Sequence, residues 1–553
     1  MLKLREYLKK TILTFIRRGT IRKKTDIVNQ QPRREASGYY PLRTNKMIKE
    51  GECPSIVRPF AKQSYFFYNI PIMSMQKPFY EKFVKKPSAA SASRTQDKSN
   101  RSQPEETRPR RQSKDEESYR KHSPQRANRK GKNLRENRSN TSYSFGKPVF
   151  SALTAEAKSI LEHFPALLDQ VLPLDAKKKQ LLPQHIHTLF HELTDERSSR
   201  KAHYLNDPVK LSAYTHYYVW WNLVRLTKLL QNLDIRLDDG DYAADFGSGP
   251  LTFICALWIA KPELRKKRLT WYCTDISNKA LNFGEELFLA LCAYTGKSAA
   301  KKDAGEEVPW TVKKVCGAFG TALSEKVSLV TEANMFNEIF WNSPLSLDDQ
   351  AEKTYRTVMH YLKPDGSFLF IEPGIPLAGE FLSLLRTQFL ETGSSVYAPC
   401  PHRGSCCFPN RNPQAGNAKI PIAIHKWCHF TFETNDSPDN LLRLSESSRL
   451  GKERASLSFL FGSLVPFSDR KAADAKQSGG IPVRICSDII KTDPQTIGRY
   501  ACSEKGFMLI TTPAYKESVL NTAVSGTLLI LPEDAADLHQ RDKKTHALLV
   551  HIR

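Results

Sequence analysis

The sequence has no long apolar segment. Its first 24 residues, MLKLREYLKKTILTFIRRGTIRKK, interrupt every short apolar run with a charge, and no stretch of about 20 apolar residues follows. We therefore expect neither a secretory signal nor contact with a membrane. The expected compartment is the cytoplasm of a bacterium or, in a eukaryote, the mitochondrial matrix, because the amphipathic basic start is compatible with organellar targeting.

The chain also lacks a Cys-x-x-Cys pair, although it contains 11 cysteines. In a reducing compartment, clustered cysteines indicate metal binding before disulfide bonding. Three of them lie in VYAPCPHRGSCCFPN (396–410), and others follow in HKWCHF, VRICSD and RYACSEKG. Four thiolates suit zinc or an iron–sulfur cluster. A loop containing Pro401, Gly404 and Pro409 can wrap a bulky cluster, but spacing alone leaves iron–sulfur, zinc and unligated thiols open.

Acidic residues are scarce at the N-terminal end. Residues 1–150 hold about 36 Lys and Arg against about 13 Asp and Glu, so they carry about +23 of the formal charge of +25. Residues 87–141 almost lack apolar side chains and cannot bury a core. We predict that residues 1–145 form a basic, largely disordered arm that binds a polyanion, with structured RNA as the expected partner.

The remaining chain alternates between helical and strand patterns. Helical periodicity fills 146–235, and apolar strands separated by helices fill 236–395, which predicts a parallel, doubly wound α/β sheet. A cysteine-rich metal-binding loop spans 396–435, and residues 436–553 predict a small β-rich C-terminal domain. We expect a monomer.

The segment DFGSGPL follows a predicted strand and opens a predicted helix. Gly247 and Gly249 allow a tight turn and a close approach to a ligand, and Asp275 ends the next strand, where a carboxylate can accept hydrogen bonds from both ribose hydroxyls. Asp245 precedes the glycines, and the third glycine of a dinucleotide fingerprint is absent. This set favours S-adenosylmethionine over NAD. The alternative is a degenerate pocket that binds nothing, since Leu251 occupies a position where many relatives have glycine.

Two further segments follow later strands. EANMFNEI contains Asn337 and Glu338, which either contact cofactor or substrate or cap the start of a helix. IEPGIP places Glu372 at the carboxyl end of a strand, where we expect it to organise the loop rather than act as a base. Methyl transfer needs mainly alignment, so we assign no catalytic residue.

The ordered motifs YLND, AYTHYYVWWNL, DFGSGPLT, IEPGIP, APCPHRGSC and WCHF resemble those of the small-ribosomal-subunit methyltransferase-like family. Its members are mitochondrial small-subunit assembly factors of yeast and animals and their bacterial relatives. The resemblance covers about 150–510, and APCPHRGSC followed by WCHF is its most specific part. It implies a class I methyltransferase fold with a Rossmann-like parallel sheet, association with the small ribosomal subunit and its rRNA, and a 4Fe–4S cluster.

The resemblance also implies particular residues. The cluster ligands become Cys400, Cys406, Cys428 and Cys502, with Cys407 competing with Cys406 and Cys486 competing with Cys502. The cofactor positions become Asp245, Gly247, Gly249 and Asp275. Two functions follow from this resemblance, a methyltransferase acting on the small subunit or a non-catalytic assembly factor with a vestigial pocket.

Overall fold

The computed structural model describes six stretches of the chain, 143–194, 203–299, 309–340, 343–408, 426–465 and 480–552. The predicted basic arm, except for its last three residues, lies outside the described residues. The following paragraphs concern only these six stretches.

A helical layer precedes the sheet, where the sequence predicts helices. Thr154 begins it as an N-cap, because its hydroxyl accepts a hydrogen bond from the Ala157 N–H at 3.2 Å. One turn, Tyr214–Val219, is a π-helix, a local widening that is frequent at functional sites. The α-helices of this layer are α2 (Ala155–Val171), α3 (Ala176–Thr194), α4 (Pro208–Ala213) and α5 (Trp220–Leu230). None of the helices in the described stretches is both long and apolar enough to cross a membrane.

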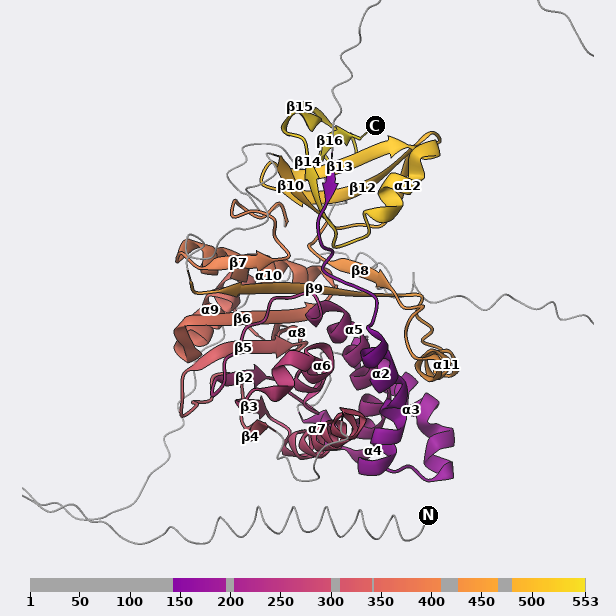
Figure 1. Ribbon diagram of the computed structural model, residues 1–553, viewed down its shortest axis with the longest axis vertical. Coiled ribbons are helices and arrows are strands. Elements are labelled where there is room, and N and C mark those ends of the chain that lie inside the picture. Colours follow the sequence, from indigo (N-terminus) through magenta and orange to yellow (C-terminus); the bar gives the residue numbers. More distant parts are fainter. Residues whose placement is uncertain are drawn as a thin grey trace, which may run out of the picture. The chain divides into compact units, whose positions relative to one another are not determined.

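A mostly parallel sheet forms the centre of the next region (Figure 1). Its strands are β2 (Tyr242–Phe246), β3 (Leu269–Asp275), β4 (Trp310–Cys316), β5 (Val327–Ala333), β6 (Leu362–Pro373), β7 (Ser395–Ala398) and β9 (Arg454–Ser463). They lie in the order β4-β3-β2-β5-β6-β9-β7, with β9 antiparallel to both of its neighbours. Counted along the chain, this order is 3-2-1-4-5-7-6. A dinucleotide-binding sheet runs 3-2-1-4-5-6. The added antiparallel strand is the class I methyltransferase arrangement, so the predicted fold is confirmed.

Helices cover both faces of this sheet. One face packs against α5, α6 (Thr252–Ala260) and α7 (Asn278–Ala299), with Trp271 and Ile371 among the buried strand residues. The other packs against α8 (Phe336–Phe340), α9 (Leu347–Tyr361) and α10 (Pro376–Glu391). Because both faces are covered, the inner strands β2 and β5 are buried along almost their whole length, as parallel strands are, whereas the edge strand β4 is partly exposed.

The predicted boundary at residue 436 does not separate the two sheets of the molecule. The strand β9 lies inside the parallel sheet, and β8 (Phe430–Glu433) pairs with it. The β-strand composition of 436–553 is as expected, but sequence pattern cannot choose which sheet an apolar strand joins. Packing between β6 and β7 decides that for β9.

The C-terminal strands form a second sheet, shown in yellow in Figure 1. They are β10 (Ile481–Ile485), β11 (Ile490–Asp493), β12 (Thr496–Ser503), β13 (Gly506–Pro513), β14 (Leu528–Leu531), β15 (Ala536–Arg541) and β16 (Leu548–His551). Consecutive strands β10, β12 and β13 pair antiparallel, β14 returns to β10, and β16 pairs parallel with β13. With α12 (Glu517–Thr522) between β13 and β14, this is the topology of an OB-fold, a five-stranded Greek-key barrel.

The first described strand also belongs to this second sheet. In β1 (Ser144–Phe145), Ser144 pairs with Ile530 and Phe145 with Leu529 of β14. The predicted arm therefore ends at the C-terminal barrel, and the chain enters the helical layer from there.

Candidate functional site: a cofactor cavity and a thiol cluster

The glycine-rich turn after β2 adopts the conformation that its sequence predicts. Gly247 and Gly249 have φ angles of 66° and 50°, in the left-handed region that glycine enters without strain. Space also requires glycine at the first position, because an added Cβ would lie 2.6 Å from the Cβ of Met335. The Ser248 N–H donates to the Thr274 carbonyl at 2.9 Å and fastens the turn to β3.

Leu251 ends this turn in a left-handed backbone conformation that normally favours glycine. Its φ is 56°, which is rare for a bulky residue, and its side chain is fully buried. Gly284 of α7 makes room for it, since a Cβ there would lie 2.7 Å from the Leu251 Cδ1. The leucine therefore points into the helix-packed core, and it is not among the residues that line the cavity beside the turn.

Asp275 forms one wall of that cavity. Its Oδ2 accepts the Gly249 N–H at 2.9 Å and its Oδ1 accepts the Ser277 N–H at 2.7 Å. Burial raises the pKa of this carboxyl, and the two backbone donors partly oppose that effect. Each carboxylate oxygen has a further acceptor position, so Asp275 can still receive two hydroxyl groups.

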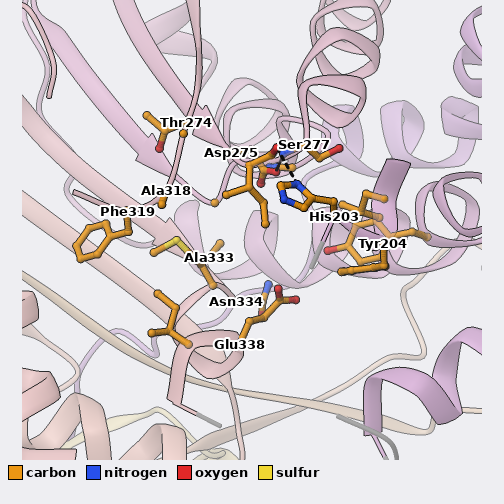
Figure 2. A pocket seen from close by; sticks show the side chains of 18 residues that line it. His203, Tyr204, Thr274, Asp275, Ser277, Ala318, Phe319, Ala333, Asn334 and Glu338 are labelled. Atoms are coloured by element: carbon orange, nitrogen blue, oxygen red, sulfur yellow. Dashed lines mark hydrogen bonds between the residues drawn. The ribbon is translucent and has the colours of Figure 1, made fainter. Parts of the chain in front are cut away.

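The cavity has a volume of about 270 Å³ and lies at the carboxyl ends of the parallel strands. Figure 2 shows Asp275 and His203 on one side of it and Asn334 and Glu338 on the other. Loops after β2, β3, β4 and β5 line it, together with residues that precede α4 or begin the π-helical turn. The lining includes both predicted glycines, Asp275 and Glu338, and it adds His203, Tyr204, Tyr214, Ala318, Phe319 and Asn334.

Sequence reasoning missed the contribution of the helical layer. His203 and Tyr204 belong to the YLND region and Tyr214 to AYTHYY, motifs noted for resemblance but given no role. The ring of His203 is fixed by a 3.1 Å hydrogen bond from Nδ1 to the Ile276 carbonyl, directly after Asp275. The aromatic content of these motifs was the available signal, but only the fold brings them to the cavity.

Asp245, predicted from the sequence to be a cofactor residue, does not line the cavity. It is 1 % exposed, and its Oδ1 accepts a hydrogen bond from the Thr331 hydroxyl at 2.8 Å. Its other oxygen has no partner in the described structure, and burial raises the pKa of the carboxyl to about 7. Asp245 therefore lies inside the sheet, beneath the turn that it precedes.

Two other buried carboxyls organise the loop after β5. Glu332 accepts the N–H groups of Met335 and Phe336, and Glu372 accepts that of Asn337 at 3.2 Å. Burial raises the pKa of Glu372 to about 7 and that of Glu332 well above its usual range, where the neighbouring Glu372 raises it further. We infer that Glu332 holds the proton of the pair. Glu372 thus organises this loop, and Asn337 lies in the first turn of α8, where its Nδ2 donates to the Asn334 carbonyl at 2.7 Å, and it does not line the cavity.

Six cysteines lie near enough to interact electrostatically, and we call them the thiol cluster. Three follow β7, one precedes β8 and two belong to the C-terminal barrel, and they are Cys400, Cys406, Cys407, Cys428, Cys486 and Cys502. Burial raises the pKa of Cys428, and the charges of the other three predicted ligands raise it further. The charges of Cys406 and Cys502 also raise the pKa of Cys400, and the charge of Cys502 raises that of Cys406, so every pair of predicted ligands interacts.

Cys502 differs from the other thiols of this cluster. Its pKa is lowered to about 5, first by Cys407 and then by His402, whose Nε2 lies 3.3 Å from the Cys502 Sγ. Because Cys407 and Cys486 both interact with Cys502, both remain competitors of the predicted ligands. Within the described stretches, no group of three or more His, Cys, Asp or Glu side chains is arranged to hold a metal ion.

The surroundings of the thiols nevertheless fit an anionic centre. Arg386 of α10 lies with its Nε 3.1 Å from the Cys400 Sγ, and the buried Arg484 of β10 donates to the Pro399 carbonyl beside it. Two buried guanidinium groups beside neutral thiols alone would be costly, whereas thiolates on a metal centre supply the opposite charge.

Comparisons with known proteins find only weak similarity to solved structures. No protein-family profile matches the chain, and no curated protein matches it. A methyltransferase from Geobacter sulfurreducens, solved with S-adenosyl-L-homocysteine, is 13% identical over 43% of this chain and 90% of that chain, with a TM-score of 0.23. One from Thiobacillus denitrificans with the same ligand is 14% identical over 44% and 90%, with a TM-score of 0.22. A Pyrococcus furiosus methyltransferase is 12% identical over 41% and 77%, with a TM-score of 0.21. These values are low, so the fold assignment depends on the strand order.

Proposed function

We propose that this chain binds S-adenosylmethionine in the cavity beside Asp275 and acts on, or helps to assemble, the small ribosomal subunit. The observation that carries the cofactor proposal is the position of Asp275, held between the N–H groups of Gly249 and Ser277 at the cavity wall. A carboxylate fixed there can accept both ribose hydroxyls. The glycine turn and the start of α6 beside it can approach the rest of the ligand.

Calorimetry with S-adenosylmethionine tests this proposal. We expect the Asp275→Ala variant to bind about 10- to 100-fold more weakly, because hydrogen bonds to a charged group contribute about 1.5–3 kcal/mol. Asp239→Ala is the matched control, because Asp239 lies in the turn before β2 and pairs only with Arg268 in the described structure. No binding by the wild type at millimolar ligand would overturn the cofactor proposal.

The ribosomal part of the proposal is supported by the motif resemblance and by the basic composition of residues 1–145. Crosslinking to rRNA, with and without residues 1–145, tests it. We expect rRNA crosslinks in the full chain, and fewer of them at raised salt or without the arm, since phosphate contacts weaken with ionic strength. Absence of rRNA crosslinks in the full chain would contradict this part.

A non-catalytic assembly factor is the second candidate. It is favoured by the fact that two titratable groups of the cavity are already engaged, Asp275 with two N–H groups and His203 with a carbonyl. Binding of S-adenosylmethionine without methyl transfer to small subunits would support this candidate, and transfer of a labelled methyl group would exclude it.

The thiol cluster is proposed to hold a structural 4Fe–4S cluster through Cys400, Cys406, Cys428 and Cys502. Convergence of these thiols and the adjacent buried arginines support it. A centre with four cysteine ligands has no open coordination position, so its expected role is to join the parallel sheet to the C-terminal barrel. Anaerobic purification should give a brown protein containing iron and sulfide. A colourless protein with zinc instead would contradict the cluster and support the zinc alternative.

A further inference from the structure

Two arginine side chains are buried beside the thiol cluster. Arg386 is 2 % exposed and Arg484 is 8 % exposed. Besides its contact with Cys400, Arg386 donates to the carbonyls of His402 and Gly404 at 2.9 and 2.8 Å. Arg484 donates to the carbonyls of Pro399 and Gly526 at 2.8 and 2.9 Å. Backbone oxygens thus satisfy these hydrogen bonds, but a carbonyl carries no full charge that could balance either guanidinium.

No carboxylate in the described stretches forms an ion pair with either arginine. A buried charge without a counter-ion costs several kcal/mol, so such groups are normally paired. The thiols are the groups beside them that can carry negative charge. The Arg386 Nε lies 3.1 Å from the Cys400 Sγ, and Arg484 is bonded to the carbonyl of Pro399, the residue before Cys400.

The charges of the two arginines match those of a four-cysteine centre. Four thiolates carry four negative charges, and an oxidised 4Fe–4S core carries two positive ones, so two negative charges remain. Arg386 approaches from α10 of the parallel sheet and Arg484 from β10 of the barrel. The two sheets therefore each contribute one compensating cation to the junction.

We propose that Arg386 and Arg484 are the counter-charges of the metal centre and hold its reduction potential above that of an uncompensated cluster. This inference rests on the proposed iron–sulfur cluster. Reduction adds one electron and makes the centre more negative, which nearby positive charges favour and their removal disfavours. Both are positioning residues, because neither is a ligand of iron.

Charge-changing and charge-keeping variants separate electrostatics from packing. Arg484→Gln and Arg386→Gln remove the charge and keep a polar side chain, whereas Arg484→Lys and Arg386→Lys keep the charge. Arg499→Gln is the matched control, because Arg499 is also a barrel arginine, 6 % exposed, and donates to the carbonyls of Leu520 and Ser487. The charges that shift its pKa belong to Asp488 and Arg454.

The experiment measures iron, acid-labile sulfide and the midpoint potential, using anaerobic full-length protein titrated with dithionite. We expect a lower potential and faster loss of cluster colour in air for both Gln variants, recovery of the potential in Arg484→Lys, and no change in Arg499→Gln. Unchanged potentials in iron-replete Gln variants, or an equal shift in Arg499→Gln, would overturn the inference alone. If a Gln variant does not fold, a Lys variant with a lowered potential would overturn it. A wild type without iron and sulfide would overturn the proposed cluster and this inference together.

Discussion

The cavity beside Asp275 and the thiol cluster are built in opposite ways. The cavity collects short loops from neighbouring parallel strands, and its key carboxylate lies within about 30 residues of its glycine turn. The thiol cluster collects residues from both sheets, and His402 meets Cys502 from 100 residues away. Local backbone geometry therefore forms the first region, whereas the packing of two domains forms the second.

The face of the C-terminal barrel formed by β12 and β13 also depends on contacts between distant segments. In OB-folds the face formed by the second and third strands often binds oligonucleotides. Here Tyr500 and Phe507 of β12 and β13 are covered, since the Lys426 ammonium lies 5.1 Å from the Tyr500 ring and Phe408 packs at 5.1 Å from Phe507. The cysteine loops thus occupy a surface that other OB-folds leave to a ligand.

The largest expected effect comes from removing a cysteine of the thiol cluster, which is proposed to join the parallel sheet to the C-terminal barrel. Cys502→Ser should lose most of its iron, because it removes the only ligand that the barrel supplies in the predicted set, while affinity for S-adenosylmethionine stays within about threefold. Iron content and calorimetry measure the two regions separately. Cys316→Ser, at the exposed end of β4, is the control. Full iron in Cys502→Ser with loss in Cys486→Ser would assign the fourth ligand to Cys486.

The same measurement decides between the adjacent cysteines after β7. We expect Cys406→Ser to lose iron and Cys407→Ser to retain it. The charge of Cys406, like that of Cys502, raises the pKa of both Cys428 and Cys400. The reverse result would place Cys407 in the ligand set and leave Cys406 as its neighbour.

Gly247→Ala should weaken ligand binding in the cavity and leave the thiol cluster unchanged. The left-handed backbone costs a side chain about 1 kcal/mol, and the clash with Met335 adds about 1–3 kcal/mol and displaces a cavity residue. Denaturant unfolding and calorimetry check this result. Gly240→Ala is the matched control, because its φ is 87° but no atom lies within 4 Å of the added Cβ. Equal losses in both variants would show that Met335 relaxes without consequence.

The smallest effect concerns pH. Burial raises the pKa of Glu372 from 4.5 to about 7. Between pH 4.5 and about 7 the folded state therefore binds more protons than the unfolded state. Stability should therefore fall as pH rises through that window, by about 1–3 kcal/mol for this group. Glu372→Gln should flatten the slope without abolishing it, because Asp245 titrates in the same range. The exposed Glu446→Gln is the control. An unchanged slope in Glu372→Gln would contradict the raised pKa.

Several features were predictable because they depend on residues close in sequence. Alternating apolar strands and helices predicted the α/β sheet, and the glycines predicted the turn at 247–249. Asp275 was found because the end of the second strand must lie beside that turn. Asp245 was predicted to bind the cofactor but does not line the cavity, because a sequence pattern places it at the end of a strand and does not say which way its side chain points.

The sequence by itself therefore determined the class of fold, the glycine turn beside the cavity and the segments that carry the cysteines. Only the tertiary structure decided that β9 joins the parallel sheet, that His203, Tyr204 and Tyr214 cover the cavity, and that two arginines flank the thiols. The physical reason is that turns and strands are specified by conformational preferences over a few residues. The partners of a buried charge or an apolar strand are instead chosen by how distant segments pack together.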